Sequence, residues 1–173
     1  MQLSLSSFSI KECRHGIMVW PKADRVIGAA LANYGEFAEG ENRIMARYLR
    51  SGDLAVDIGA NVGSTTLPMA CAVGAAGQVF AFEPQPLVGH CLATSLVLNE
   101  ISNVRVLSLA VSQRAGVAKM DFNAGGDAGN FGSTALSLDG DLVPTIALDD
   151  LHVDRLALLK IDVEGHEWDV FQG

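Results

Sequence analysis

Short runs of apolar residues alternate along most of the chain with longer stretches in which apolar positions recur at helical spacing. Apolar runs bounded by glycine, aspartate or proline are typical of strands that are buried on both faces. We expect four such core strands, at 54–58, 78–82, 104–109 and 156–161, and helices at 62–73, 86–99 and from about 165 onward. This alternation predicts an α/β fold with a doubly wound parallel sheet and right-handed crossovers.

The first 50 residues follow a different pattern. Two short β-like runs, 8–13 and 17–20, are separated by a histidine and a glycine, which together predict a hairpin turn. The stretch 23–50 then has helical spacing with charged residues on its solvated face. We therefore expect an N-terminal β-hairpin with a helical cap over residues 1–50 and a sheet domain over residues 51–173.

The second half of the chain interrupts the simple alternation. Two further β-like stretches, 116–122 and 143–148, flank a segment at 123–141 that is rich in Gly, Asn, Asp and Ser. A loop of that length is typical of a lid or a binding loop. A sheet that ended at Gly173 would leave the fourth core strand as an apolar edge, which proteins usually avoid. We expect either a second copy of the chain to cover this edge or the sequence to be truncated after its fourth core strand, and we favour truncation.

A turn of small residues follows the first core strand, Gly59-Ala60-Asn61-Val62-Gly63. Such a turn between a buried strand and a helix predicts a nucleotide-type cofactor site at the carboxyl end of a parallel sheet. Asn61 stands in place of a middle glycine, and asparagine tolerates positive φ better than most residues. We expect Gly59 to let the backbone approach the cofactor, Ala60 and Asn61 to contact it, and Gly63 to let the helix pack on the sheet.

Two carboxylates lie at the ends of the first two core strands. We expect Asp57 to receive an ammonium group or to organise water around an amino-acid tail. Glu83, which lies 20 residues beyond Gly63, can accept hydrogen bonds from both hydroxyls of a ribose. Taken singly, each carboxylate is better explained as a plain polar strand end, whereas the pair at this spacing favours a cofactor site.

The third core strand is followed by Ala110 and Val111, whose small apolar surface would suit the flat ring of adenine. A strand end without any binding role is an equally good interpretation of these two residues.

Ionisable residues crowd the turn after the fourth core strand. We expect Asp162 or Glu164 to contact the amino-acid part of the cofactor or to orient the acceptor, and Glu164 or His166 to act as a general base toward a hydroxyl. For His166 and Glu167 the competing interpretation is that they cap the following helix. We expect no metal site, because no second cluster with ligand spacing occurs in the sequence.

Composition narrows the class of protein. The 173 residues are 49% apolar and only 18% charged, which indicates a domain with a real hydrophobic core. The net charge of -8 argues against non-specific nucleic-acid binding. The cysteines, Cys13, Cys71 and Cys91, form no CxxC pair and predict free thiols in a reducing compartment. With neither a signal-peptide pattern nor a membrane-length apolar run, we expect a cytoplasmic protein that binds neither nucleic acid nor membranes.

Together these residues resemble the FkbM-type family of S-adenosylmethionine-dependent methyltransferases. The matching segments are 57–63, Phe82-Glu83-Pro84 and 159–167, of which Lys-Ile-Asp-Val-Glu-Gly-x-Glu is the most specific, and the resemblance covers about residues 24–173. It implies a Rossmann-like class I methyltransferase fold, S-adenosyl-L-methionine as cofactor, and most often O-methylation of a hydroxyl on a sugar or natural product. This fold normally has seven strands, of which the last three would follow Gly173.

An enzyme of this kind mainly aligns acceptor, methyl group and sulfur, and an apolar pocket suits the reaction. Phe131 and Trp168 are candidates to line such a pocket, although we expect Trp168 rather to pack in the core. One alternative is a truncated, non-catalytic module that binds cofactor or a partner. Another is a nicotinamide-dependent oxidoreductase, which would share Glu83 but needs the middle glycine that this turn lacks.

Overall fold

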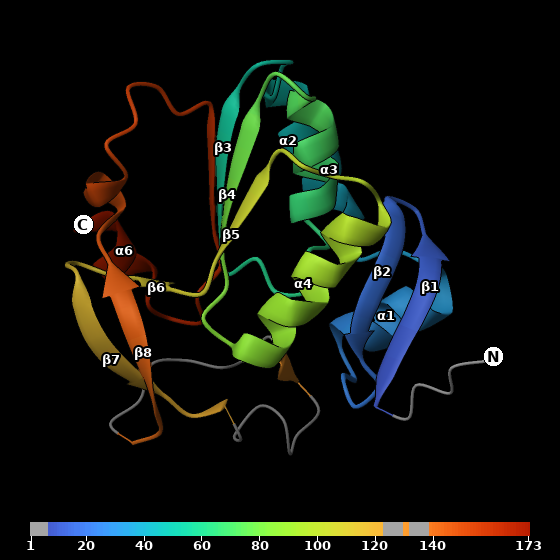
Figure 1. Cartoon of the computed structure of the whole chain (residues 1–173), viewed down its shortest axis with the longest axis horizontal. Coiled ribbons are helices and arrows are strands. Elements are labelled where there is room, and N and C mark those ends of the chain that lie inside the picture. The colour runs from blue at the N-terminus through green and yellow to red at the C-terminus, as the bar shows by residue number, and fades with distance from the viewer. Residues whose placement is uncertain (1–6, 123–129, 132–138) are drawn as a thin grey trace.

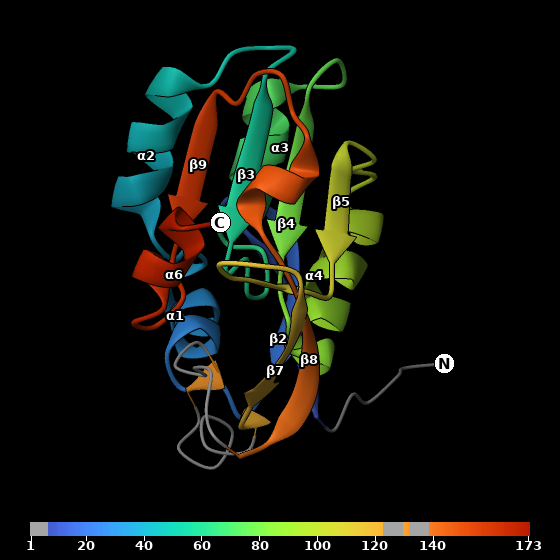
Figure 2. The ribbon, with the colours of Figure 1, turned by 90° about the vertical axis from the view of Figure 1, so that its left-hand side faces the viewer.

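Four parallel strands form the centre of the fold. The computed structural model describes residues 7–122, 130–131 and 139–173. The strands lie in the order β5-β4-β3-β9, all parallel, and Figure 2 shows them side by side with their arrowheads pointing the same way. Their bounds are β3 Leu54–Ile58, β4 Gln78–Phe82, β5 Val104–Leu107 and β9 Leu158–Ile161. The predicted parallel α/β sheet is therefore confirmed, with the first two strands at their predicted bounds and the other two each shorter by two residues.

The order of the strands places a crevice in the sheet. Counted along the chain, the central strands run third, second, first, fourth, as in the first four strands of a Rossmann-type sheet. From β3 the chain moves outward to β4 and β5, and it later returns to the opposite side of β3 as β9. Ligands of open α/β sheets bind outside the carboxyl ends of the strands at such a reversal. The place to look for a site is thus the carboxyl end of β3, between β4 and β9.

The two faces of the sheet are covered by different layers. Figure 1 shows helices α2 (Glu39–Tyr48), α3 (Thr66–Val73) and α4 (Pro86–Leu98) on one side. On that side Ala55 and Val79 pack against α2 and α3, while Val56 and Phe82 face the opposite layer. Because alternate residues of β3 and β4 are buried on opposite faces, these strands appear in the sequence as mostly apolar runs, with Asp57 the buried polar residue inside β3.

The opposite layer contains a small three-stranded sheet. Its order is β6-β8-β7, with β8 parallel to β6 and antiparallel to β7. The bounds are β6 Ala110–Val111, β7 Gly116–Met120 and β8 Asp141–Ile146, followed by a 3-10 turn, η2, at Leu148–Leu151. The two predicted β-like stretches are therefore strands, whereas most of the predicted loop at 123–141 lies outside the described residues.

The N-terminal region is a hairpin followed by helices. Strands β1 (Phe8–Cys13) and β2 (Gly16–Pro21) pair antiparallel, as predicted, and α1 (Ile27–Tyr34) comes next. Helix α1 ends at Gly35, whose φ of 71° is left-handed, so the predicted helical stretch 23–50 is two helices. Among the described residues no helix has the length and apolar content that a membrane span needs, and all three cysteines are free thiols.

Two sequence expectations about helices are wrong. The helix expected at 62–73 begins only at Thr66, because Asn61 and Gly63 have positive φ and hold the chain in a turn. Trp168, expected in the core, is 72% exposed in α6 (Glu167–Phe171). The buried residue of this short helix is Val170, and residues two apart in a helix do not share a face.

The hairpin is held on α4 by side chains that complete the hydrogen bonding of β2. Ser95 Oγ accepts from Val19 N at 2.9 Å. Asn99 accepts from Ile17 N at 2.8 Å through Oδ1 and donates to Ile17 O at 2.7 Å through Nδ2. Asn99 thus does more than end α4 at its C-terminus, since its amide pairs with β2 as a neighbouring strand would.

Replacing Asn99 with alanine should therefore destabilise the protein. Asn99→Ala leaves both backbone groups of Ile17 without these partners, so we expect the free energy of unfolding to fall by about 1–3 kcal/mol. Urea denaturation measures this change. Thr94→Ala is the matched control, because Thr94 is exposed and its hydroxyl donates to His90 O within the same helix. Equal losses in the two variants would contradict the proposed role of Asn99 in holding the hairpin.

A candidate cofactor pocket at the carboxyl ends of the central strands

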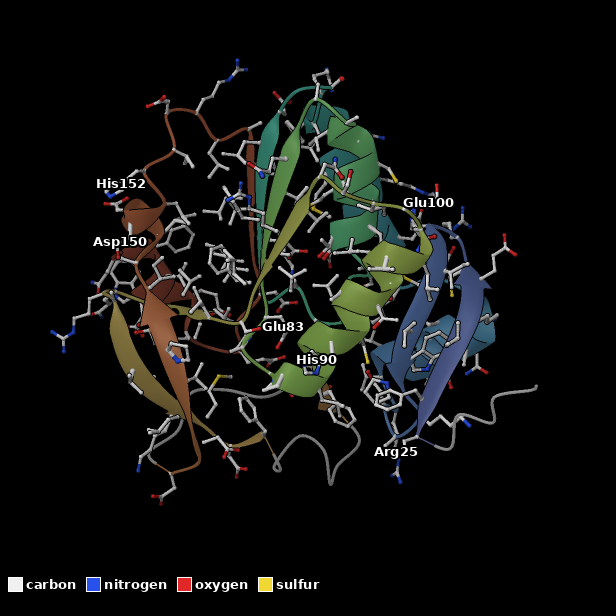
Figure 3. The ribbon with its side chains drawn as sticks, viewed as in Figure 1. Arg25, Glu83, His90, Glu100, Asp150 and His152 are labelled. Atoms are coloured by element: carbon white, nitrogen blue, oxygen red, sulfur yellow. The ribbon has the colours of Figure 1, made fainter. Side chains whose placement is uncertain are left out.

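A pocket of about 180 Å³ opens where β3, β4 and β9 end. Figure 3 shows Glu83 at this end of β4, beside the start of α4 that carries His90. Of the residues expected at a cofactor or catalytic site, eight line the pocket: Gly59, Asn61, Glu83, Ala110, Val111, Asp162, Glu164 and His166. Asp57, Ala60 and Gly63 are not in its wall. The fold therefore brings together side chains from three parallel strand ends and from β6.

The turn after β3 has a geometry that its small residues allow. Gly59 has a φ of 77°, and a Cβ atom there would lie 1.9 Å from the carbonyl oxygen of Asp162. Close packing of the chain after β9 therefore already requires this glycine, in addition to any ligand. Asn61 has a φ of 49°, which agrees with the tolerance of asparagine for this region. At Gly63 a Cβ atom would lie 2.5 Å from Leu92 of α4, so this glycine allows the turn to pack on the helix.

Asp57 lies beneath the turn and is paired with Lys160. The two residues are neighbours in the parallel register of β3 and β9, and Lys160 Nζ is 3.1 Å from Asp57 Oδ1. The hydroxyls of Thr65 and Thr66 donate to Asp57 Oδ2 at 2.8 and 2.7 Å. Because Asp57 is fully buried and surrounded by these donors, we assign it a positioning role in place of the direct contact expected from the sequence.

Lys160 also holds the turn itself. Its ammonium donates to Gly59 O at 2.7 Å and lies 3.8 Å from Asp162 Oδ2. One partly buried cation thus joins the end of β3, the glycine turn and the residue that follows β9. The sequence showed Lys160 only as part of a motif, because Asp57 and Gly59 lie about a hundred positions earlier in the chain.

Glu83 is a buried acid in the pocket wall whose pKa is strongly shifted. Only 3% of the residue is exposed, and its two carboxylate oxygens accept from Asn61 N at 2.9 Å and Gln85 N at 2.8 Å. Burial raises the pKa of Glu83 to about 7, against the opposing effect of these backbone donors and of Lys160. A carboxylate offers about four acceptor positions, so two remain for further donors from a ligand in the pocket.

Gln85 and Phe131 are pocket residues that join separate segments. Gln85 Nε2 donates to Phe131 O at 2.6 Å, and Phe131 lines the pocket, as its sequence position suggested. Sequence reasoning missed Gln85 because nothing in the pattern distinguishes it from other polar residues after a strand. It also missed Val26, Ile27 and Phe37, through which the N-terminal region forms part of the wall.

The segment after β9 presents three titratable side chains to the pocket. Asp162 is largely exposed, and Glu164 is exposed with a φ of 51°. His166 makes no capping bond with its side chain and instead contacts Ser112 and Asp169. Glu167 does bond to backbone near the start of α6, since its Oε1 accepts from Gly165 N at 3.1 Å, as the capping interpretation requires.

The family model described as the methyltransferase FkbM domain matches residues 57–173, which is more than half of the chain. This chain belongs to the FkbM family of methyltransferases. The resemblance found in the sequence is thereby confirmed. S-adenosylmethionine is the cofactor of this family, and the pocket has features that suit it: a buried carboxylate with free acceptor positions and a small apolar surface at Ala110 and Val111.

Among curated proteins, hexuronic acid methyltransferase AglP of Haloferax volcanii is similar to this chain. The two are 28% identical over 136 residues, which cover 76% of this chain and 54% of that protein. The chain therefore spans about half the length of this relative.

Solved structures resemble parts of the fold. TYW2 of P. horikoshii in complex with MeSAdo has a TM-score of 0.49 and 18% identity, over 62% of this chain and 38% of that one. A SAM-dependent O-methyltransferase of Thermotoga maritima has a TM-score of 0.41 and 20% identity, over 58% and 40% of the two chains. Because both scores lie below 0.5, the family assignment rests on the sequence model.

The buried ion pair beneath the turn predicts a large effect on stability. Lys160→Met removes the cation and leaves Asp57 charged in the interior, so we expect the free energy of unfolding to fall by about 3–5 kcal/mol. Urea denaturation at neutral pH measures this loss. Lys119→Met, at an exposed position on β7, is the control and should change stability little. A small effect of Lys160→Met, equal to the control, would contradict the role assigned to the pair.

Proposed function

We propose that this protein binds S-adenosylmethionine in the pocket and transfers its methyl group to a hydroxyl of a sugar or a related natural product. The family supports methyl transfer, and the similarity to a relative named as a hexuronic acid methyltransferase supports a sugar-like acceptor. The single observation that carries the proposal is Glu83, a buried carboxylate with acceptor positions free at the carboxyl end of β4.

In this proposal Glu83 accepts hydrogen bonds from both ribose hydroxyls. In this proposal the backbone of Gly59 and Asn61 faces the amino-acid part of the cofactor, and Gly63 lets that turn pack against α4. Asp57 acts indirectly, because with Lys160 it fixes the turn. Ala110 and Val111 provide the apolar surface for the adenine ring.

The chemistry demands mainly alignment. The sulfonium of the bound cofactor supplies a methyl group with a good neutral leaving group. Holding an acceptor hydroxyl in line with it can contribute about 7–11 kcal/mol of the barrier reduction. Asp162, Glu164 and His166 line the pocket. In this proposal Asp162 and Glu164 orient the acceptor, and either Glu164 or His166 takes the proton of its hydroxyl. The side chains of Ile27, Phe37 and Phe131 give the pocket an apolar wall.

The partner of the enzyme in this proposal is a small molecule. Strand β9 lies at an edge of the sheet within the described residues, and a second copy of the chain covering that edge stays a prediction. Size-exclusion chromatography with light scattering would show whether such a dimer forms.

Calorimetric titration with S-adenosylhomocysteine tests the proposal at its first step. We expect micromolar binding of S-adenosylhomocysteine and none of NAD, the control ligand for an oxidoreductase. Radiolabelled S-adenosylmethionine with a panel of glycosides then tests transfer, detected as label in the acceptor. Binding without transfer to any acceptor would favour the alternative of a non-catalytic cofactor-binding module, and binding of NAD alone would contradict the proposal.

The raised pKa of Glu83 makes cofactor binding depend on pH. The carboxylate form accepts the ribose hydroxyls, whereas below pH 7 the free protein holds Glu83 protonated and must lose a proton on binding. The dissociation constant of S-adenosylhomocysteine should therefore level off above pH 7 and rise toward about tenfold per pH unit well below it. Calorimetry over this range measures the profile.

Glu83→Gln is the matched variant, because it keeps the size of the side chain and leaves His166 in place. Its affinity should be lower than that of the wild type above pH 7 and should lack this dependence on pH. An unchanged profile in Glu83→Gln would assign the dependence to another group of the pocket.

A further inference from the structure

The imidazole of His166 is held between two side chains from different elements. Its Nε2 atom is 3.0 Å from the hydroxyl of Ser112, which follows β6. Its Nδ1 atom is 2.8 Å from Oδ2 of Asp169, one turn further along α6. The imidazole is 22% exposed, and the residue forms part of the pocket wall. Ser112 and Asp169 thus contact the two ring nitrogens of His166 beside the proposed methyl-transfer site.

These contacts determine which nitrogen of the ring carries the proton. A carboxylate oxygen 2.8 Å away would repel the lone pair of a ring nitrogen that lacks hydrogen, so this contact favours hydrogen on Nδ1 of His166. In the neutral ring Nε2 then has a free lone pair, to which the hydroxyl of Ser112 donates. Asp169 is in turn fixed by Gln113, whose Nε2 donates to the other carboxylate oxygen.

The carboxylates that line the pocket are not held between two partner side chains in this way. Asp162 has a side chain that is 69% exposed and lies beside the ammonium of Lys160, while Glu164 is exposed to solvent. Both carboxylate oxygens of Glu83 accept from backbone donors. A general base needs a fixed direction toward the proton it removes, and an imidazole has its reference pKa nearest to neutral pH. Of the candidates along the wall, His166 meets both conditions.

We propose that His166 is the general base of the transfer and that Asp169 is the positioning residue that fixes its tautomer; this rests on the function proposed above. The acceptor hydroxyl takes the place of Ser112 Oγ at Nε2. As its oxygen bonds to the methyl carbon, the carbon–sulfur bond breaks with its electron pair left on sulfur. The hydroxyl proton passes to Nε2, and the resulting imidazolium is stabilised by Asp169.

The same contacts also fasten α6 to the segment after β6, so the test has to separate the two roles. Gln172 provides a matched control, because its Oε1 accepts from Gln113 at 2.7 Å and belongs to the fastening without touching His166. Asp169→Asn and Gln172→Ala therefore both weaken the attachment of α6, but only Asp169→Asn changes the partner of Nδ1.

Nitrogen-15 NMR of the imidazole rings tests the tautomer without any acceptor. The chain has four histidines, so the His166 signals can be assigned by their loss in His166→Gln. At neutral pH we expect hydrogen on Nδ1 in the wild type and in Gln172→Ala, and a shift toward hydrogen on Nε2 in Asp169→Asn. Hydrogen on Nε2 in the wild type would overturn the proposal, and so would a tautomer that Asp169→Asn leaves unchanged.

Methyl transfer to an acceptor found with the glycoside panel tests the base itself. Asp169→Asn should lower kcat by about 10²-fold or more while the affinity for S-adenosylhomocysteine is kept, and Gln172→Ala should keep both. Equal losses of kcat in the two variants would show that Asp169 only fastens α6. A chain that binds S-adenosylhomocysteine but methylates nothing would contradict the proposed function and the base role, while the NMR result would still decide whether Asp169 sets the tautomer.

Discussion

The ion pair between Asp57 and Lys160 is the interaction on which the rest of the site depends. It joins β3 to β9, the two strands between which the order of the strands along the chain reverses. From Lys160 the contacts continue to Gly59 O and so to the turn that presents Asn61 N to Glu83. Glu83 then accepts from Gln85, whose side chain reaches Phe131 on the far wall of the pocket. A buried pair beneath the sheet end is thus connected by hydrogen bonds to both walls of the pocket.

Burial explains why the charge of Asp57 needs these partners. A charge removed from water is costly unless it is paired and its remaining positions are hydrogen-bonded. Asp57 meets this condition through Lys160 at Oδ1 and the hydroxyls of Thr65 and Thr66 at Oδ2. These partners lie in β9, in the turn after β3 and at the start of α3. Any displacement of the turn would break several of these contacts at once. These contacts would preorganise the proposed cofactor site, and preorganisation of this kind favours binding and alignment.

Sequence reasoning predicted what depends on neighbouring residues. The bounds of β3 and β4 follow from local apolar runs, and the positive φ of Asn61 follows from the chemistry of asparagine in a turn. Sequence reasoning failed where the contacts of a residue are set by a partner far away in the sequence. The carboxylate of Asp57 was expected to meet the cofactor, but the register of β9 brings Lys160 to it. The contact of His166 with Ser112 joins residues 54 positions apart, and no local pattern indicates it. Trp168 was misplaced because one aromatic residue in a short helix does not define the buried face.

A crystal structure of the chain with S-adenosylhomocysteine is the most direct test of this account. The central claim is that the crevice at the ends of β3, β4 and β9 holds the cofactor with Glu83 at its ribose. The account predicts both ribose hydroxyls within hydrogen-bond distance of the Glu83 carboxylate, the adenine against Ala110 and Val111, and the Asp57–Lys160 pair unchanged beneath the turn. A ligand bound elsewhere, or a ribose that has no contact with Glu83, would contradict it.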